Sequence, residues 1–211
     1  MSIELLDPCK LIERVHPELW QDAGWSYALD YSWIIQQCAA HPVRPPAGMR
    51  YIADAGCGVA PFSPLGGFIA AMLGVDCVGI DRDLGRPFEE FSPAALPEII
   101  FWASSLEHNI AEKMRKLYLR SMELLPPGGF FLATITIART THWFDPSLNT
   151  NLTCEDAAQM FDEPQMIGDY DDVWEAYRQD QGMMAKYGAR YGHFDENDPL
   201  FIIAGVKKVK A

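Results

Sequence analysis

Two acids and two glycines in this chain stand where α/β proteins bind ligands. Asp54 follows a short apolar run and is followed at once by Gly56 and Gly58. Glycine permits a tight turn and a close backbone approach that a Cβ would forbid. A second apolar run, 75–80, ends in Asp81, and open α/β sheets bind ligands at such strand ends. Two acids at the ends of two strands joined by a helix favour a ligand that carries hydroxyls and a cationic group.

The same segment resembles a known family. D-A-G-C-G at 54–58 and V-G-I-D at 78–81 resemble the first motifs of the class I S-adenosylmethionine (SAM)-dependent methyltransferases, of the small-molecule or sugar-pathway type. Residues 101–109 match the family's fourth-strand motif, and 123–137 match its helix–PGG–fifth-strand unit. The resemblance covers 51–137 in family order. It implies SAM as cofactor and an α/β, Rossmann-like, doubly wound sheet, mostly parallel, with an antiparallel closing strand and an N-terminal helical cap.

The resemblance also assigns cofactor contacts. Asp81 is expected to accept hydrogen bonds from the ribose hydroxyls, and charge strengthens such bonds. The alternative for Asp54 is an ordinary helix-capping acid, and for Arg82 a solvated side chain. An NAD-binding turn would need glycine where this chain has Pro61. The residues expected to bind SAM are Asp54, Gly56, Cys57, Gly58, Asp81, Arg82, Ser104, Ser105 and Leu106.

Methyl transfer needs an aligned nucleophile, exclusion of water and removal of one proton. His108 in the fourth-strand motif and His142 after the fifth strand are the candidate bases, because histidine titrates near neutrality. The alternatives are a pocket-wall histidine and a surface-loop histidine. For Glu107, in the same motif, the alternative to a role in the site is a helix-start acid, favoured there by the helix dipole. Tyr31 and Trp143 are expected to contact the substrate.

The sequence argues against a metal site. The ubiquinone O-methyltransferases resemble this segment but carry a metal-binding acid three residues before the Glu-His pair, where this chain has Ser104. The five cysteines are scattered without a C-x-x-C pair, a spacing that favours small buried thiols over metal ligands.

One domain is expected over 1–211, consistent with its length. Its parts are an N-terminal helical cap (1–48), a cofactor-binding core (49–137) and a substrate-side segment with closing strands (138–211). The aromatic-rich segment 16–41 is predicted to be helical, and either packs on the sheet or covers the SAM pocket.

Apolar patterning predicts the elements that hold these residues. The interval between Asp81 and Ile99 is short and broken by prolines, so the family's third strand is expected to be abbreviated or absent. A loop and a helix capped at Thr153 are expected within 138–161. Strands are predicted near 51–53, 75–81, 98–104, 130–137 and 199–209, and helices over 66–74, 104–125 and 171–188.

The composition of the chain disfavours some classes of partner and location. The chain has 17 basic and 29 acidic residues, a net charge of -12, and such a surface repels nucleic acid backbones. No apolar run reaches the ~18 residues of a membrane span. The first ten residues lack the order of a secretory signal, so a cytoplasmic location is expected. Nothing in the sequence indicates an oligomeric state.

These observations predict a SAM-dependent methyltransferase that acts on an oxygen or nitrogen of a small molecule or sugar-like metabolite. The alternative is a SAM-binding subunit that has lost transfer activity, suggested by the shortened region after Asp81. An NAD-linked oxidoreductase is a third option.

Overall fold

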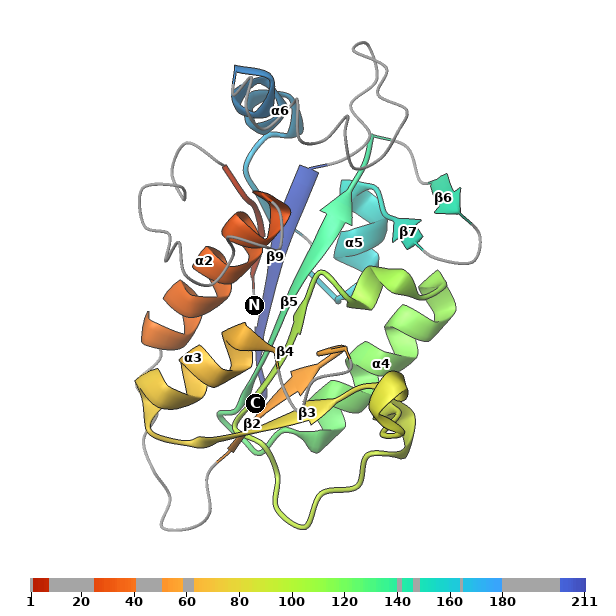
Figure 1. The fold of residues 1–211 in the computed structure, drawn as a ribbon. Coiled ribbons are helices and arrows are strands. Elements are labelled where there is room, and N and C mark those ends of the chain that lie inside the picture. The colour runs from red at the N-terminus through yellow and green to blue at the C-terminus, as the bar shows by residue number, and fades with distance from the viewer. Residues whose placement is uncertain are drawn as a thin grey trace.

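A seven-stranded sheet forms the centre of the protein (Figure 1). The computed structural model describes residues 2–7, 25–40, 51–58, 63–139, 142–145, 149–163, 165–179 and 202–211. Within them the strand order is β3-β2-β4-β5-β9-β1-β8. The strands are β1 (Ser2–Leu5), β2 (Tyr51–Ala55), β3 (Asp76–Ile80), β4 (Ile99–Ala103), β5 (Phe130–Ile137), β8 (Met166–Ile167) and β9 (Ile202–Val209).

Strand direction confirms the predicted sheet. β2 pairs in parallel with β3 and with β4, and β4 pairs in parallel with β5. β9 runs antiparallel to both of its neighbours, β5 and β1. The sheet is therefore mostly parallel with one antiparallel strand. β2, β4 and β5 are apolar and buried along almost their whole length, as parallel strands covered on both faces must be.

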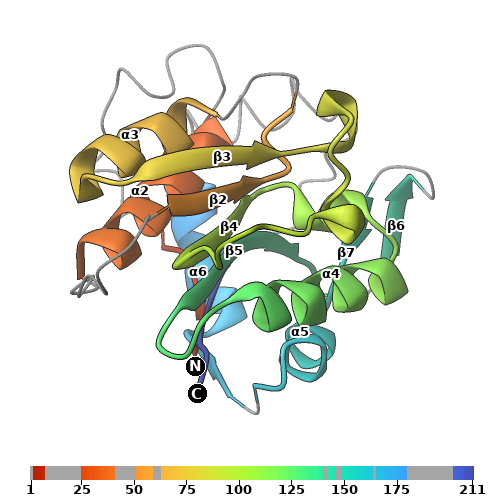
Figure 2. The same ribbon diagram turned by 90° about the horizontal axis from the view of Figure 1, so that it is seen from below.

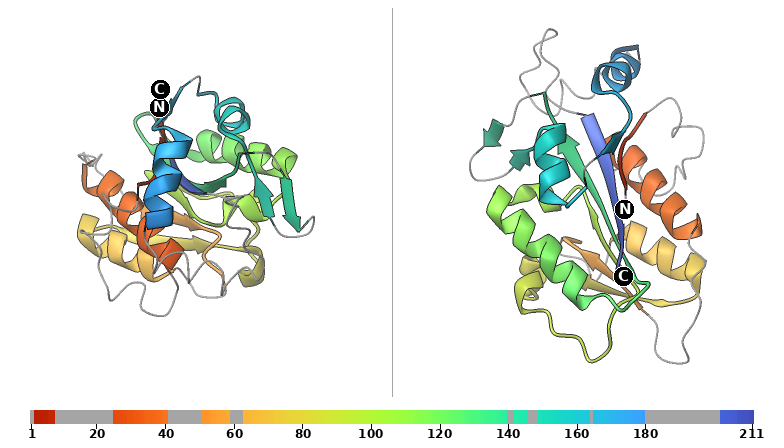
Figure 3. Two further views of the ribbon diagram at one scale, coloured as in Figure 1. Left: turned by 90° about the horizontal axis from the view of Figure 1, so that it is seen from above. Right: turned by 180° about the vertical axis from the view of Figure 1, so that it is seen from behind.

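Helices cover the two faces of this sheet. α2 (Trp25–Ala40) and α3 (Pro64–Leu73) lie on one face, and α4 (Ala111–Leu124) and α5 (Cys154–Met160) lie on the other (Figures 2 and 3). On the second face Tyr118 of α4 makes edge contacts with Phe131 of β5 and Phe161 after α5, at ring-centroid distances of 5.3 and 5.2 Å. α6 (Tyr170–Gln179) lies beyond the end of the sheet where β9 begins (Figure 1).

The chain reverses direction across the sheet between β3 and β4. From β2 it passes through α3 to β3 at the sheet edge, then returns to β4 on the other side of β2. Ligands of open α/β sheets bind at the carboxyl ends of the strands at such a reversal. The fold thus places the ends of β2, β3 and β4, where the predicted site residues stand, around one crevice.

α2 is fixed to the sheet by Trp33. Its indole Nε1 donates a hydrogen bond to Glu4 Oε2 of β1 at 3.1 Å. Its ring lies directly on the backbone of Gly205 in β9, where an added Cβ would come within 2.3 to 2.5 Å of three ring carbons. Trp33 therefore packs on the sheet, which was one of the two interpretations of this aromatic segment.

Replacing Gly205 with alanine is expected to lower the free energy of unfolding by about 1–3 kcal/mol, the usual cost of overpacking. Urea unfolding measures the loss. The double variant Gly205→Ala, Trp33→Leu should recover part of it, because the smaller side chain vacates the space that the new methyl needs. An unchanged midpoint in the single variant would contradict the close packing of the ring on β9.

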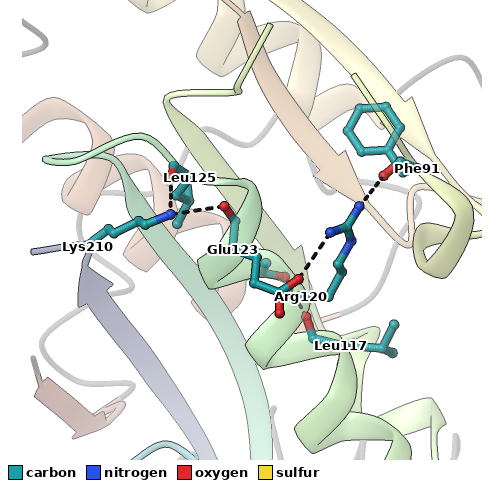
Figure 4. Close-up of polar contacts among 7 residues, drawn as sticks. Phe91, Leu117, Arg120, Glu123, Leu125 and Lys210 are labelled. Atoms are coloured by element: carbon teal, nitrogen blue, oxygen red, sulfur yellow. Dashed lines mark hydrogen bonds and ion pairs between the residues drawn. The ribbon is translucent and has the colours of Figure 1, made fainter. Parts of the chain in front are cut away.

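Lys210 closes the carboxyl end of α4. Its Nζ donates to the backbone oxygens of Glu123 and Leu125 at 2.9 and 2.6 Å (Figure 4). The last carbonyls of a helix lack partners within the helix, and a basic side chain there also suits the helix dipole. The residue after β9 thus anchors the helix that forms one side of the crevice.

Several elements differ from the sequence prediction. The N-terminal segment was predicted to be a helical cap, but its first described residues form β1, and α2 begins at Trp25 in the described part. The helix predicted over 104–125 is divided into a short 3-10 turn, η5 (Leu106–His108), and α4. β6 (His142–Asp145) and β7 (Asn149–Asn151) form a separate two-stranded sheet where a loop was expected.

Other predictions are confirmed. No strand lies between β3 and β4, where the structure has only the 3-10 turns η3 (Arg82–Leu84) and η4 (Phe88–Glu90). Thr153 caps α5, its hydroxyl accepting from the backbone of Asp156 at 3.1 Å. α6 covers the first part of the helix predicted over 171–188, and the remainder lies outside the described residues.

Candidate functional site

The turn after β2 is held against the tip of β4. Gly56 and Gly58 both have left-handed φ angles, 75° and 76°, which favour glycine. A Cβ on Gly56 would lie 2.5 Å from both Cβ and Oγ of Ser105. Ser105 Oγ in turn donates to the Ala55 oxygen at 3.1 Å. The turn therefore needs glycine at position 56 for two independent reasons, backbone conformation and space.

Asp54 lies beneath this turn. Its side chain is 2% exposed, and Oδ2 accepts a hydrogen bond from the Ser63 backbone N–H at 2.6 Å. The Ser63 hydroxyl caps α3 by accepting from Gly66 N at 3.1 Å. Burial raises the pKa of Asp54 to about 6, against the opposing effect of the Ser63 hydrogen bonds. This geometry is that of the helix-start acid; contact of Asp54 with a cofactor stays a prediction.

Asp81 joins the tips of β2 and β3. One carboxylate oxygen accepts from Gly58 N at 2.9 Å and the other from Asp83 N at 2.8 Å. Each carboxylate oxygen can accept a second hydrogen bond. Asp81 is only half-buried, so it keeps acceptor capacity toward solvent or a ligand while its position is fixed by two backbone amides.

A cleft of about 440 Å³ opens beside these residues, within the usual size of small-molecule sites. The turn, the tip of β3 and the side of α4 surround it. The residues that line it are Gly56, Gly58, Ile80, Asp81, Arg82, Asp83, Pro87, Phe88, Glu89, Glu90, Trp102, Ser105, His108, Asn109, Lys113 and Leu117.

Side chains hold the wall of the cleft in the interval between β3 and β4. Phe88 of η4 packs on Trp102 of β4 with ring centroids 4.9 Å apart. Lys113 Nζ pairs with Glu89 at 2.7 Å. Arg120 of α4 donates to the oxygen of Phe91 at 3.0 Å (Figure 4). Contacts from α4 and β4 therefore fix this wall of the cleft beside Asp81.

The tip of β4 carries buried polar groups. Ser104 has a left-handed φ of 44°, unusual for a residue other than glycine. Its backbone N–H donates to Thr134 Oγ1 at 3.0 Å, and its hydroxyl donates to Asp30 Oδ2 of α2 at 2.6 Å. Glu107 in η5 is only 3% exposed. Burial raises the pKa of Glu107 to about 8, while its own backbone and the Ser104 hydroxyl act in the opposite direction.

Solved structures share this architecture, although no family model and no curated protein sequence matches the chain. Coclaurine N-methyltransferase bound to N-methylheliamine and SAH matches with a TM-score of 0.59 at 8% identity, over 100% of this chain and 82% of its own. The cyclopropane synthase MmaA2 from Mycobacterium tuberculosis has a TM-score of 0.52 at 14% identity, over 98% and 92% of the two chains. The plantazolicin methyltransferase BpumL in complex with SAH has a TM-score of 0.51 at 11% identity, over 90% and 86%.

The chain has the class I methyltransferase fold.

Six residues predicted from the methyltransferase motifs lie together around the cleft: Gly56, Gly58, Asp81, Arg82, Ser105 and His108. Arg82 and His108 are exposed there. Four other predicted residues are not among those that line it. Leu106 is fully buried in the core. Asp54 lies below the turn, Cys57 lies within it, and Ser104 lies at the tip of β4.

The predicted substrate-side residues lie farther along the chain. Tyr31 is buried on α2. His142 and Trp143 stand on β6, paired with Asn151 and Thr150 of β7, and their side chains lie outside the described residues. Thr150 Oγ1 donates to the Asn109 oxygen at 2.7 Å, so β7 lies next to η5.

Sequence reasoning missed Asp30, and for Glu107 it left open a helix-start role. An acid between Leu29 and Tyr31 in an apolar helix was the available signal for Asp30. Glu107 precedes α4 by a full turn and is buried, so a surface helix-start role does not describe it.

Two features are absent from the described residues. No cluster of three or more histidines, cysteines or acids could hold a metal ion among them. None of the helices in that part of the chain combines the length and the apolar content that crossing a bilayer requires.

Proposed function

We propose that this protein is a SAM-dependent methyltransferase that acts on an oxygen or nitrogen of a small molecule or sugar-like metabolite. The observation that carries the proposal is the cleft at the carboxyl ends of β2, β3 and β4, with the glycine turn and the anchored Asp81 on its border. Two of the structures with this fold are named as methyltransferases that hold SAH.

The cleft residues suit an adenosyl group. Asp81 offers carboxylate oxygens to vicinal ribose hydroxyls, and Phe88 and Trp102 offer apolar rings to a flat base. The glycine turn brings backbone close to the ligand without side chains. Bound SAM would supply a methyl carbon already activated by its sulfonium, so the protein has to align the acceptor, exclude water and manage one proton.

Charge favours SAM over a pyrophosphate cofactor. Four carboxylates (Asp81, Asp83, Glu89 and Glu90) and two basic side chains (Arg82 and Lys113) line the cleft. A rim with excess negative charge attracts a sulfonium and an ammonium group but repels a pyrophosphate. The same argument disfavours the NAD-linked alternative.

His108 is the first candidate base in this proposal. Its side chain is exposed and borders the cleft at the end of η5, where it can exchange protons with solvent. His142 remains the second candidate base. It stands on β6, which pairs with β7, and β7 in turn contacts Asn109 at the border of the cleft.

Calorimetric titration with SAM and SAH, followed by a methyl-donor turnover assay on a panel of small metabolites, tests the proposal. We expect both ligands to bind and SAH to be released with at least one acceptor. Absence of SAM and SAH binding would exclude the function. Tight binding without turnover would instead support a second candidate, a SAM-binding subunit without transfer activity, which the absence of a strand between β3 and β4 favours.

Replacing Asp81 with alanine is expected to weaken SAM binding by about 1.5–3 kcal/mol, the scale of hydrogen bonds to a charged group. Part of the loss comes from the turn, because Gly58 N and Asp83 N lose their acceptor. Asp76→Ala is the matched control, since Asp76 is exposed at the opposite end of β3. Calorimetric affinities for SAM measure both. Near-native affinity in Asp81→Ala would show that Asp81 does not hold the ribose.

A further inference from the structure

Two buried carboxyl groups meet one hydroxyl beside the tip of β4. Asp30 of α2 is fully buried and Glu107 of η5 is 3% exposed. The Ser104 hydroxyl donates to Asp30 Oδ2 at 2.6 Å, and it also lies within hydrogen-bonding reach of Glu107. We call Asp30, Ser104 and Glu107 the acidic cluster.

The acidic cluster lacks a donor for Glu107. A serine hydroxyl has one proton to donate, and in this structure that proton serves Asp30. Among the residues that the structure describes, Glu107 Oε2 is buried without a hydrogen-bond partner. No basic side chain is among the groups that influence the pKa of Glu107, which are its own backbone and Ser104. A buried carboxylate without a partner costs several kcal/mol, so a cation or a hydrogen-bond donor is missing at this atom.

The acidic cluster and the cleft lie on different sides of the β4 tip. Ser105 and His108 line the cleft together with residues of α4, whereas Ser104 and Glu107 are absent from its lining. Ser104 points instead to α2, which covers the opposite face of the sheet (Figure 3). A group bound at the acidic cluster would therefore face the cofactor across the tip of the strand rather than share the adenosyl cleft.

We propose that the acidic cluster binds the protonated amine of the methyl acceptor, so that the enzyme is an N-methyltransferase of small primary or secondary amines. This inference rests on the proposed methyltransferase function and adds the class of acceptor. The ammonium group supplies the donor that Glu107 lacks, and Asp30 supplies a second acceptor on the far side of Ser104. An alcohol lacks the charge that makes burial of both acids favourable.

The transfer step balances with these groups. Glu107 is protonated in the free protein at neutral pH, so binding of the ammonium first releases that proton to solvent. An ammonium has no free electron pair, so one N–H proton then passes to the Glu107 carboxylate. The neutral nitrogen forms a bond to the sulfonium methyl carbon as the carbon–sulfur bond breaks, and the sulfur keeps the electron pair. The products are a methylated ammonium and neutral SAH, and Glu107 is left protonated as in the free protein. In this role Glu107 is a catalytic residue.

Binding of matched amines and alcohols to the SAH-loaded protein tests the acceptor class. The probes are benzylamine, 2-phenylethylamine and cyclohexylamine, each paired with the alcohol of the same skeleton, and titration calorimetry measures their affinity. We expect at least one amine to bind, and we expect its alcohol to bind at least about tenfold more weakly, the scale of one charged hydrogen bond. Equal affinity within every pair, or no binding of any amine, would overturn the proposal.

Substitutions in the acidic cluster test which side chains bind the amine. Glu107→Gln and Asp30→Asn keep side-chain shape, and each is expected to lower amine affinity about tenfold or more while SAH affinity stays within about twofold. Glu155→Gln, at an exposed position of α5, is the matched control and should change neither. A loss of SAH affinity in Glu107→Gln would assign the cluster to the cofactor's own cation and overturn the acceptor site. Failure of the wild-type protein to bind SAH would instead count against the methyltransferase function itself.

Discussion

Replacing Gly56 with valine is expected to abolish SAM binding while the sheet still forms. The new Cβ would stand 2.5 Å from Cβ and Oγ of Ser105, far inside van der Waals contact. Valine at a φ of 75° adds strain of about 1–3 kcal/mol. The turn can relieve both the clash with Ser105 and the backbone strain only by moving off the tip of β4. That movement displaces Gly58 N from Asp81 and changes the wall of the cleft.

The expected loss of SAM affinity is at least about a hundredfold, or about 3 kcal/mol, and titration calorimetry measures it. Gly74→Ala is the control, because Gly74 also has a left-handed φ angle but an added Cβ there meets nothing within 4 Å. Gly74 caps α3 and is not among the residues that line the cleft, so its variant should lose stability without losing affinity. If Gly56→Val bound SAM as well as this control does, the turn would not be the cofactor site.

The sequence was most informative where local chemistry fixes the backbone. Glycines at 56 and 58, an acid at 81 and the apolar run of β5 each restrict the chain within a few residues, and each lies where the motifs predicted. The absence of the third strand was also predictable, because prolines in that interval cannot donate to a strand ladder. The contacts that hold this interval could not be predicted, because they join residues distant in sequence, among them Phe88, Lys113 and Arg120.

Other features depend on tertiary context alone. The four residues of β1 carry no pattern that separates a strand from a short loop. They form a strand because they pair with β9. The partnership of Asp30 with Ser104 joins residues 74 positions apart. An acid at position 30 stands out in an apolar helix, but nothing in the sequence spacing indicates that Ser104 is its partner.

Glu107→Gln is expected to stabilise the free protein at alkaline pH. Burial raises the pKa of Glu107 from the ordinary 4.5 to about 8, so the folded protein holds a proton that the unfolded chain releases. A group whose pKa is higher in the folded state contributes stability that is complete below its unfolded pKa and is lost as the pH rises through its folded pKa. Between pH 4.5 and 8 the wild-type protein should lose up to about 5 kcal/mol from this residue, at 1.36 kcal/mol for each pKa unit.

Glutamine has no proton to lose, so the variant should match the wild type near pH 4.5 and exceed its free energy of unfolding above pH 8. Urea unfolding across this pH range measures the difference. Asp54, with a pKa raised to about 6, gives a separate decline that ends near pH 6 and persists in the Glu107 variant, which separates the two acids. The exposed control Glu155→Gln should give a difference that does not change with pH. A difference that stays constant for Glu107→Gln as well would mean that Glu107 is already charged and compensated in the fold, and that no cation is missing beside Ser104.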